Sequence, residues 1–148
     1  MYSVPQFIQY FIKMLLTWHI SATEAMGLSG SLVAIWDPNW VSFKAYRCFA
    51  GILLDGHIHG TRGHIHVLNT YAPYKHWAIF WDCLFSFGNM KLASLIFFGD
   101  LNCIISIEEV WGQSKRLDPL ARMFRDALLA YNCVDIYLEE MAPTWDNG

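Results

Sequence analysis

The stretch "ASLIFFGDLNCI", residues 93–104, decides the fold class because it joins an apolar strand to a polar tip. Residues 95–98 are contiguous large apolar residues, a pattern typical of a strand covered on both faces of a sheet. Asp100 and Asn102 follow at once. Gly, Asp and Asn are also ordinary turn residues. The motif therefore has two interpretations: a simple turn, or two reactive side chains mounted on the end of a rigid strand.

The segments around this strand predict strands with interspersed helices, a pattern that favours α+β or layered α/β packing. Turn residues, period-two patterns and period-3.6 patterns mark the elements. They predict a strand within 27–38, a hairpin over 45–73 with its tip at 60–63, a helix from Trp77 to a cap at Gly88, a helix capped by Asp118 with Pro119 at its first position and Asn132 at its end, and a strand over 134–138.

Composition favours one folded domain. The chain has 148 residues, of which 55% are hydrophobic and 16% aromatic, ample for a core. Ten Lys and Arg against 13 Asp and Glu give a net charge of −3. A protein that binds nucleic acid tightly by itself usually carries a basic excess. Tight DNA binding by this chain alone is therefore disfavoured.

The cysteines and the N-terminal segment bear on location. Cys48, Cys83, Cys103 and Cys133 lie far apart and form no C-x-x-C pair, which predicts reduced, mostly buried thiols. Residues 1–20 are apolar, but polar residues interrupt them and no positive charge precedes Lys13. This pattern fits neither a membrane span nor a signal peptide. We predict a partly amphipathic helix there, and a nuclear or cytoplasmic protein rather than a secreted one.

Four histidines of the predicted hairpin form two H-x-H pairs: His57, His59, His64 and His66. On strands, such pairs could gather imidazoles around zinc or copper. The alternative is a solvent-facing side on which His alternates with Ile. No Cys or carboxylate completes a familiar metal spacing, so the structural interpretation is favoured and no metal site is predicted.

Two further motifs are weak. "GLSGS", residues 27–31, lacks both the dinucleotide and the P-loop patterns, and a strand follows it. Glu108 and Glu109 are adjacent, so their side chains diverge and a solvated loop pair is favoured over a catalytic dyad.

Polar residues also end two other segments, "NTYAP" at 69–73 and "PTWDNG" at 143–148. Together with "GDLN", these three ends could meet on one rim of a sheet sandwich, where a phosphate-handling site would sit. The chain resembles the endonuclease domain of a plant-type non-LTR (LINE-like) retrotransposon, in the endonuclease/exonuclease/phosphatase superfamily. The resemblance rests on segments that occur in a matching order and spacing: "GLSGSLVAIWDP", "VLNTYAPY", "FWDCL", "FFGDLN", "EEVWG", "RLDPLA", "VDIYL" and "PTWDNG".

The resemblance implies a DNase-I-like four-layer sandwich, with two facing, mostly antiparallel sheets and helices outside. It also implies a Mg²⁺-dependent DNA-nicking hydrolase. Asp100 would activate the attacking water, Asn102 would orient the reacting groups, and Tyr71 would hydrogen-bond the scissile phosphate. Thr144 and Asn69 would lie near the phosphate. Hydrolysis of a phosphodiester needs such a base, such donors and a hard cation.

The chain also departs from the family. The family's metal-binding Glu in a Q-E-T context and its Ser-Asp-His strand have no counterpart here, so no metal ligand is assigned. We therefore expect an apolar segment at 1–16 and a partial domain at 17–148, an inactive remnant with weak DNA binding or none. No membrane and no obligate protein partner are expected. Two alternatives stay open: a catalytically dead nucleic-acid-binding or interaction module, and a phosphatase of the same superfamily.

Overall fold

The computed structural model describes residues 9, 13, 15–23, 31–48, 50–73, 76–86, 91–109, 116–117 and 119–136, without the side chains of Trp77, Ser86 and Glu108. The chain divides into two compact units, residues 1–101 and 102–148. The first unit contains the described strands, and the second contains a helix with the loop before it. Each unit is considered by itself.

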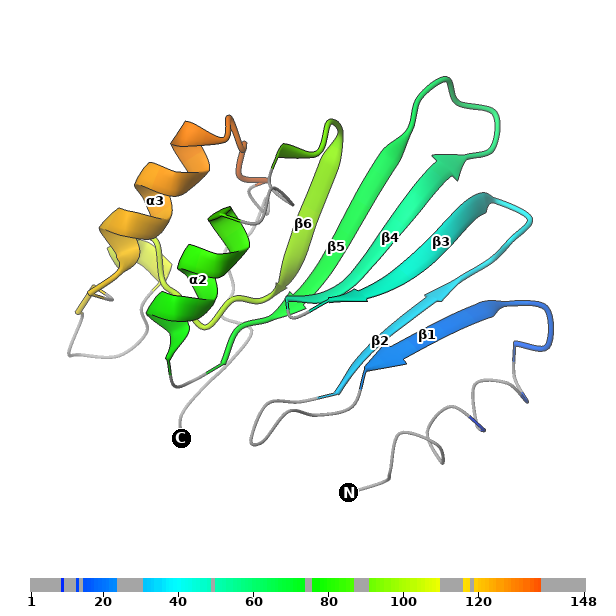
Figure 1. The fold of residues 1–148 in the computed structure, drawn as a ribbon, viewed down its shortest axis with the longest axis horizontal. Coiled ribbons are helices and arrows are strands. Elements are labelled where there is room, and N and C mark those ends of the chain that lie inside the picture. Colours follow the sequence, from blue (N-terminus) through cyan, green and yellow to red (C-terminus); the bar gives the residue numbers. More distant parts are fainter. Residues whose placement is uncertain are drawn as a thin grey trace. The chain divides into compact units, whose positions relative to one another are not determined.

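The first unit contains two sheets. β1 (His19–Thr23) and β2 (Leu32–Trp36) pair antiparallel as a two-stranded sheet. The second sheet has the order β3–β4–β5–β6, as Figure 1 shows. Its strands are β3 (Val41–Cys48), β4 (Gly51–Ile58), β5 (Ile65–Tyr71) and β6 (Leu95–Asp100). Neighbours pair antiparallel except β5 and β6, which run parallel.

The parallel pair requires a crossover, and helix α2 (Trp77–Ser86) lies on it. The apolar stripe predicted for this helix is confirmed where side chains are described, because Phe80, Trp81 and Leu84 are buried. The Trp81 ring meets the Phe97 ring of β6 edge-on, with 6.1 Å between centroids. Helix α2 therefore covers the face of the sheet to which Phe97 belongs. The cap expected at Gly88 lies outside the described residues.

The core of this unit lies on both faces of β4 and β5. Leu68 pairs in register with Phe97, so it shares the face covered by α2, and it is fully buried. Ile52 and Leu54 lie on the opposite face and are also buried. β1 and β2 both contact β4, and α2 covers the other face, so we place the two-stranded sheet over Ile52 and Leu54, whose burial it explains. The unit therefore has three successive layers: two-stranded sheet, four-stranded sheet and helix.

One expectation for β6 is wrong. The contiguous apolar run predicted a strand covered on both faces, but Ile96 and Phe98 are 44% and 48% exposed. They lie on the face opposite Phe97. The physical reason is position: β6 forms one edge of the sheet, beyond β4 and β5 with their cover from β1 and β2.

The second unit contains helix α3 (Ala121–Ala130). It begins later than predicted, since its cap is Leu120, and its first hydrogen bond runs from the Phe124 N–H to the Leu120 carbonyl, 2.9 Å. Pro119 lies in the preceding turn and Asp118 outside the described residues. The predicted end is confirmed: Asn132 has φ +54°, a left-handed conformation that closes helices.

Three further expectations need correction. The strand predicted over 134–138 is not formed at 134–136, where Val134 and Ile136 are 87% and 82% exposed; residues 137–138 lie outside the description. The apolar segment read as a helix over 1–20 ends in β1, because His19 and Ile20 pair with β2. The four cysteines are free, as predicted, but half-buried rather than buried.

The predicted strand within 27–38 and the hairpin with its tip at 60–63 are confirmed as β2 and as β4–β5. β1 and most of β3 were missed. Apolar and polar residues alternate along β3, and over a shorter window along β1, as in half-covered strands, so a period-two signal was present and was overlooked. The described residues establish a mixed α/β fold with two sheets, which confirms the coarse fold class.

Candidate functional site

The structure brings two of the predicted site residues together at the carboxyl ends of β5 and β6. Tyr71 and Asp100 are register partners on these parallel strands, although 29 positions separate them in the sequence. The Ala72 N–H donates to the Asp100 carbonyl at 2.8 Å, which continues the ladder just past both residues. Residues paired in register project to the same face of a sheet. The phenol and the carboxylate therefore share one strand end and one face.

Asn69 belongs to the same face. It lies two residues before Tyr71 on β5, and its register partner is Phe98. Asn69 also pairs with Ile52 of β4, one of the buried residues on the side of the two-stranded sheet. Asn69 and Tyr71 are half-buried, whereas Asp100 is exposed. The three side chains thus form a polar group at the inner rim of the sheet pair, which we call the rim group.

Gly99 makes this pairing possible. Its φ is +136°, and a Cβ at this position would lie 1.9 Å from the Thr70 carbonyl oxygen. Only a glycine lets β6 approach β5 this closely in this conformation. The glycine before Asp100 in "GDLN" is therefore a structural requirement of the β5–β6 ladder.

Asn102 belongs to the second unit and is considered there. It is half-buried with φ +44°, a left-handed conformation in which Asn is enriched among non-glycine residues. The backbone alone accounts for an Asn at this position. Its role in orienting reacting groups remains a prediction.

The remaining acidic and polar candidates are Thr144, Glu108 and Glu109. Thr144 lies outside the described residues, as does the Glu108 side chain. Glu109 is exposed, and its Oε2 accepts a hydrogen bond from the Ile105 N–H at 3.1 Å. That bond closes the turn between them, in line with the loop role predicted for Glu109.

Magnesium can be tested against the residues of the rim group. Asp100 is the only carboxylate in β5 and β6, and within the described part of the chain it belongs to no group of three metal-ligating side chains. Mg²⁺ usually takes one or two carboxylates and keeps several waters. One carboxylate with the Asn69 amide on the same face fits a weakly held, largely hydrated Mg²⁺. It does not fit a preformed cage.

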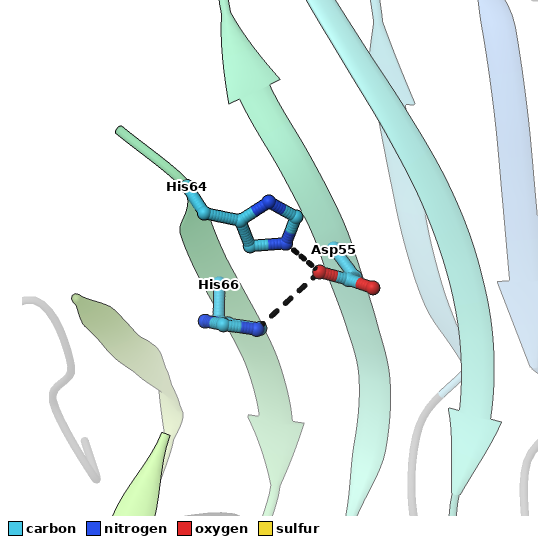
Figure 2. A group of neighbouring side chains, drawn as sticks. All are labelled: Asp55, His64 and His66. Atoms are coloured by element: carbon cyan, nitrogen blue, oxygen red, sulfur yellow. Dashed lines mark hydrogen bonds and ion pairs between the residues drawn. The ribbon is translucent and has the colours of Figure 1, made fainter. Parts of the chain in front are cut away.

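The histidines of the β4–β5 hairpin separate into two pairs. The His57 and His59 rings lie 5.6 Å apart, and the His64 and His66 rings 4.9 Å apart. The second pair converges on Asp55, as Figure 2 shows. No carboxylate completes a familiar metal spacing in the sequence, so Asp55 was not predicted as a ligand. The missing signal was the hairpin register, in which Asp55 and His66 are directly opposite.

Comparison with models of protein families and with curated proteins found no match. No helix among the described residues is both long and apolar enough to cross a bilayer.

Proposed function

We propose that this chain derives from a Mg²⁺-dependent DNA-nicking endonuclease of the endonuclease/exonuclease/phosphatase superfamily, and that the rim group is its phosphodiester site. The register pairing of Tyr71 with Asp100 carries the proposal. The resemblance assigns these two residues to the phosphate and to the attacking water. Two residues with such roles must lie close together. The β5–β6 register meets this requirement, although nothing in the two local motifs demands it.

The chemistry of the rim group suits a phosphodiester. The Tyr71 phenol can donate a hydrogen bond to a non-bridging oxygen, where negative charge grows during attack. The Asp100 carboxylate can accept a proton from a water molecule held against the phosphorus. The Asn69 amide can donate to a second oxygen. A Mg²⁺ bound beside Asp100 would supply the positive charge that such a reaction also needs.

The layers of the first unit support the same proposal. A two-stranded sheet, a four-stranded sheet and a helix stack in that order, as expected for part of a DNase-I-like four-layer sandwich. The rim group lies at the strand ends on the face toward the second sheet. Ends of rigid strands hold catalytic groups more accurately than loops do.

Turnover is expected to be low. The two strands supply one carboxylate, and the net charge of −3 repels the DNA backbone. We therefore propose a site that binds a phosphodiester weakly in the presence of Mg²⁺ and cleaves it slowly or not at all.

Binding is the sharper test. Fluorescence anisotropy of a labelled DNA duplex with the full chain, with and without Mg²⁺, should show tighter binding with the ion. Asp100→Ala should remove the Mg²⁺ effect. Tyr71→Phe should weaken binding by about 10-fold or more, since a hydrogen bond to a charged group is worth about 1.5–3 kcal/mol. Asp82→Ala is the matched control, because Asp82 is an exposed carboxylate on α2, away from the rim group. The proposal is wrong if Asp82→Ala and Asp100→Ala behave alike.

Plasmid nicking completes the test. Supercoiled plasmid with the full chain and Mg²⁺ should give trace nicking at most, and any nicking should disappear in Asp100→Ala. Robust nicking that survives this substitution would show that the reaction occurs elsewhere.

A further inference from the structure

A second cluster of polar side chains lies at the other end of β5. Asp55 of β4 faces His66 of β5 in register, and His64 precedes β5 in the hairpin loop. In Figure 2 both imidazoles point at one carboxylate oxygen. The ligand atoms of the three residues lie within 4.8 Å of one another, the only such group of three in the described residues. Tyr71 lies five positions after His66 along β5, roughly 16 Å, so this cluster is distinct from the rim group.

The hydrogen bonds of His66 determine which ring nitrogen is available. Its Nδ1 lies 2.9 Å from the Ala93 carbonyl oxygen. A carbonyl oxygen only accepts, so Nδ1 must carry the proton. In the neutral ring, Nε2 then has a lone pair. That Nε2 lies 3.3 Å from Asp55 Oδ1, which also has only lone pairs to offer.

Two acceptors at this distance repel each other unless a proton or a metal ion lies between them. A metal ion bound by both atoms would turn this repulsion into attraction. An imidazole whose other nitrogen donates to a backbone carbonyl is the usual arrangement of a metal-ligating histidine, because that bond fixes the tautomer and the ring orientation. The His66 side chain is only 16% exposed, so the ring is held within the fold rather than in free solvent.

The other two ligands complete a half-open site. His64 Nε2 is hydrogen-bonded to the same Asp55 Oδ1, and the His64 side chain is 58% exposed. Asp55 is 31% exposed. Two imidazoles and one carboxylate are a set that zinc and other first-row transition ions accept, with positions left for water.

One neighbouring charge opposes a cation here. Lys44 of β3 is the register partner of Asp55. Its ammonium group lies over the Tyr46 ring, 5.0 Å from the centroid. At the next position on this face, His57 of β4 pairs with the uncharged Ser42 of β3. A Lys beside the site lowers its affinity for a dication without supplying a competing ligand.

We propose that Asp55, His64 and His66 bind a Zn²⁺ ion, which joins the two strands of the β4–β5 hairpin. This proposal does not depend on the proposed nuclease ancestry. Mg²⁺ is excluded as the preferred ion, because hard cations favour oxygen ligands over imidazole.

The test is calorimetric titration of ZnCl₂ into the reduced full chain, free of chelators. One Zn²⁺ per chain should bind, and excess Mg²⁺ should not displace it. Asp55→Asn keeps the shape of the side chain and should weaken Zn²⁺ binding by about 10–100-fold or more. Even the loss of a residue that only hydrogen-bonds to a ligand typically weakens metal binding by this factor. The double variant His57→Gln/His59→Gln is the matched control, since it removes the hairpin's other imidazole pair, and it should bind as the unchanged chain does. Circular dichroism would verify that each variant folds.

Co²⁺ provides a second readout that separates this site from the cysteines. Bound Co²⁺ should show the ligand-field absorption of nitrogen and oxygen ligands without a thiolate charge-transfer band, and Asp55→Asn should abolish that absorption. The proposal is overturned if no Zn²⁺ binds, if Asp55→Asn binds as tightly as the unchanged chain, if the control variant loses affinity equally, or if Co²⁺ reports thiolate ligands.

Discussion

Replacing Gly99 with Ala tests the geometry on which the rim group depends. A Cβ at Gly99 would lie 1.9 Å from the Thr70 carbonyl oxygen, whereas real Cβ atoms essentially never approach within 3.0 Å. The clashing atom belongs to the backbone of β5, so no side-chain rotation can relieve it. The two strands must therefore move apart by more than 1 Å at this position.

The cost follows from the contacts at this position. A hydrogen bond lengthened by more than 1 Å is effectively lost. Losing about two bonds of the ladder, including that from Ala72 to Asp100, costs roughly 2–3 kcal/mol. An L residue at φ +136° adds roughly 1–3 kcal/mol of backbone strain. We expect Gly99→Ala to lower the free energy of unfolding by about 3–6 kcal/mol, a large share of the 5–15 kcal/mol typical of a domain.

Gly63→Ala separates the two contributions. Gly63 has a similar φ of +148°, but a Cβ there would meet no atom within 4 Å. This variant should lose only the strain of roughly 1–3 kcal/mol. Urea unfolding followed by tryptophan fluorescence would measure both. With a slope of about 1–3 kcal/mol per molar urea, the Gly99 variant should unfold at a midpoint about 1 M lower than the Gly63 variant. Equal midpoints would refute the close approach of β5 and β6.

Three further outcomes are expected. Thr70 is fully buried and donates to the Ala50 carbonyl, so Thr70→Val should cost about 1–3 kcal/mol in urea unfolding while Thr70→Ser retains the bond. Trp81 is also fully buried, so Trp81→Ala should cost about 3–5 kcal/mol by the same measurement; a loss below 1 kcal/mol would contradict its central place in the core. The His64 hydrogen bond lowers the pKa of Asp55 in the folded state, so its contribution to stability is present above the ordinary Asp pKa of about 3.9 and is lost as pH falls through the folded value. Between pH 6 and pH 3 the midpoint temperature of thermal unfolding should therefore fall more steeply for the unchanged chain than for Asp55→Asn. Parallel curves of midpoint against pH would exclude this linkage.

The sequence alone determined the elements with strong local signals. The β4–β5 hairpin, the stripe of α2 and the left-handed residue that ends α3 follow from turn residues and apolar periods, which act over a few neighbouring positions. The polar ends of β5 and β6 were also visible, since "NTYAP" and "GDLN" interrupt apolar runs. The alternation of polar and apolar residues in β1 and β3 was overlooked, and a short apolar run predicted a strand at 134–136 that is not formed.

Only the tertiary structure decided which side chains meet. The pairing of Tyr71 with Asp100 and that of Asp55 with His66 are both matters of strand register. A shift of one residue would turn either pair to opposite faces, and no local motif reports that shift. Register is set by the packing of whole faces: Leu68 against the α2 side, and Ile52 against the two-stranded sheet. The chemistry-bearing residues were therefore visible in the sequence, but their partnerships depend on long-range burial that the sequence does not display.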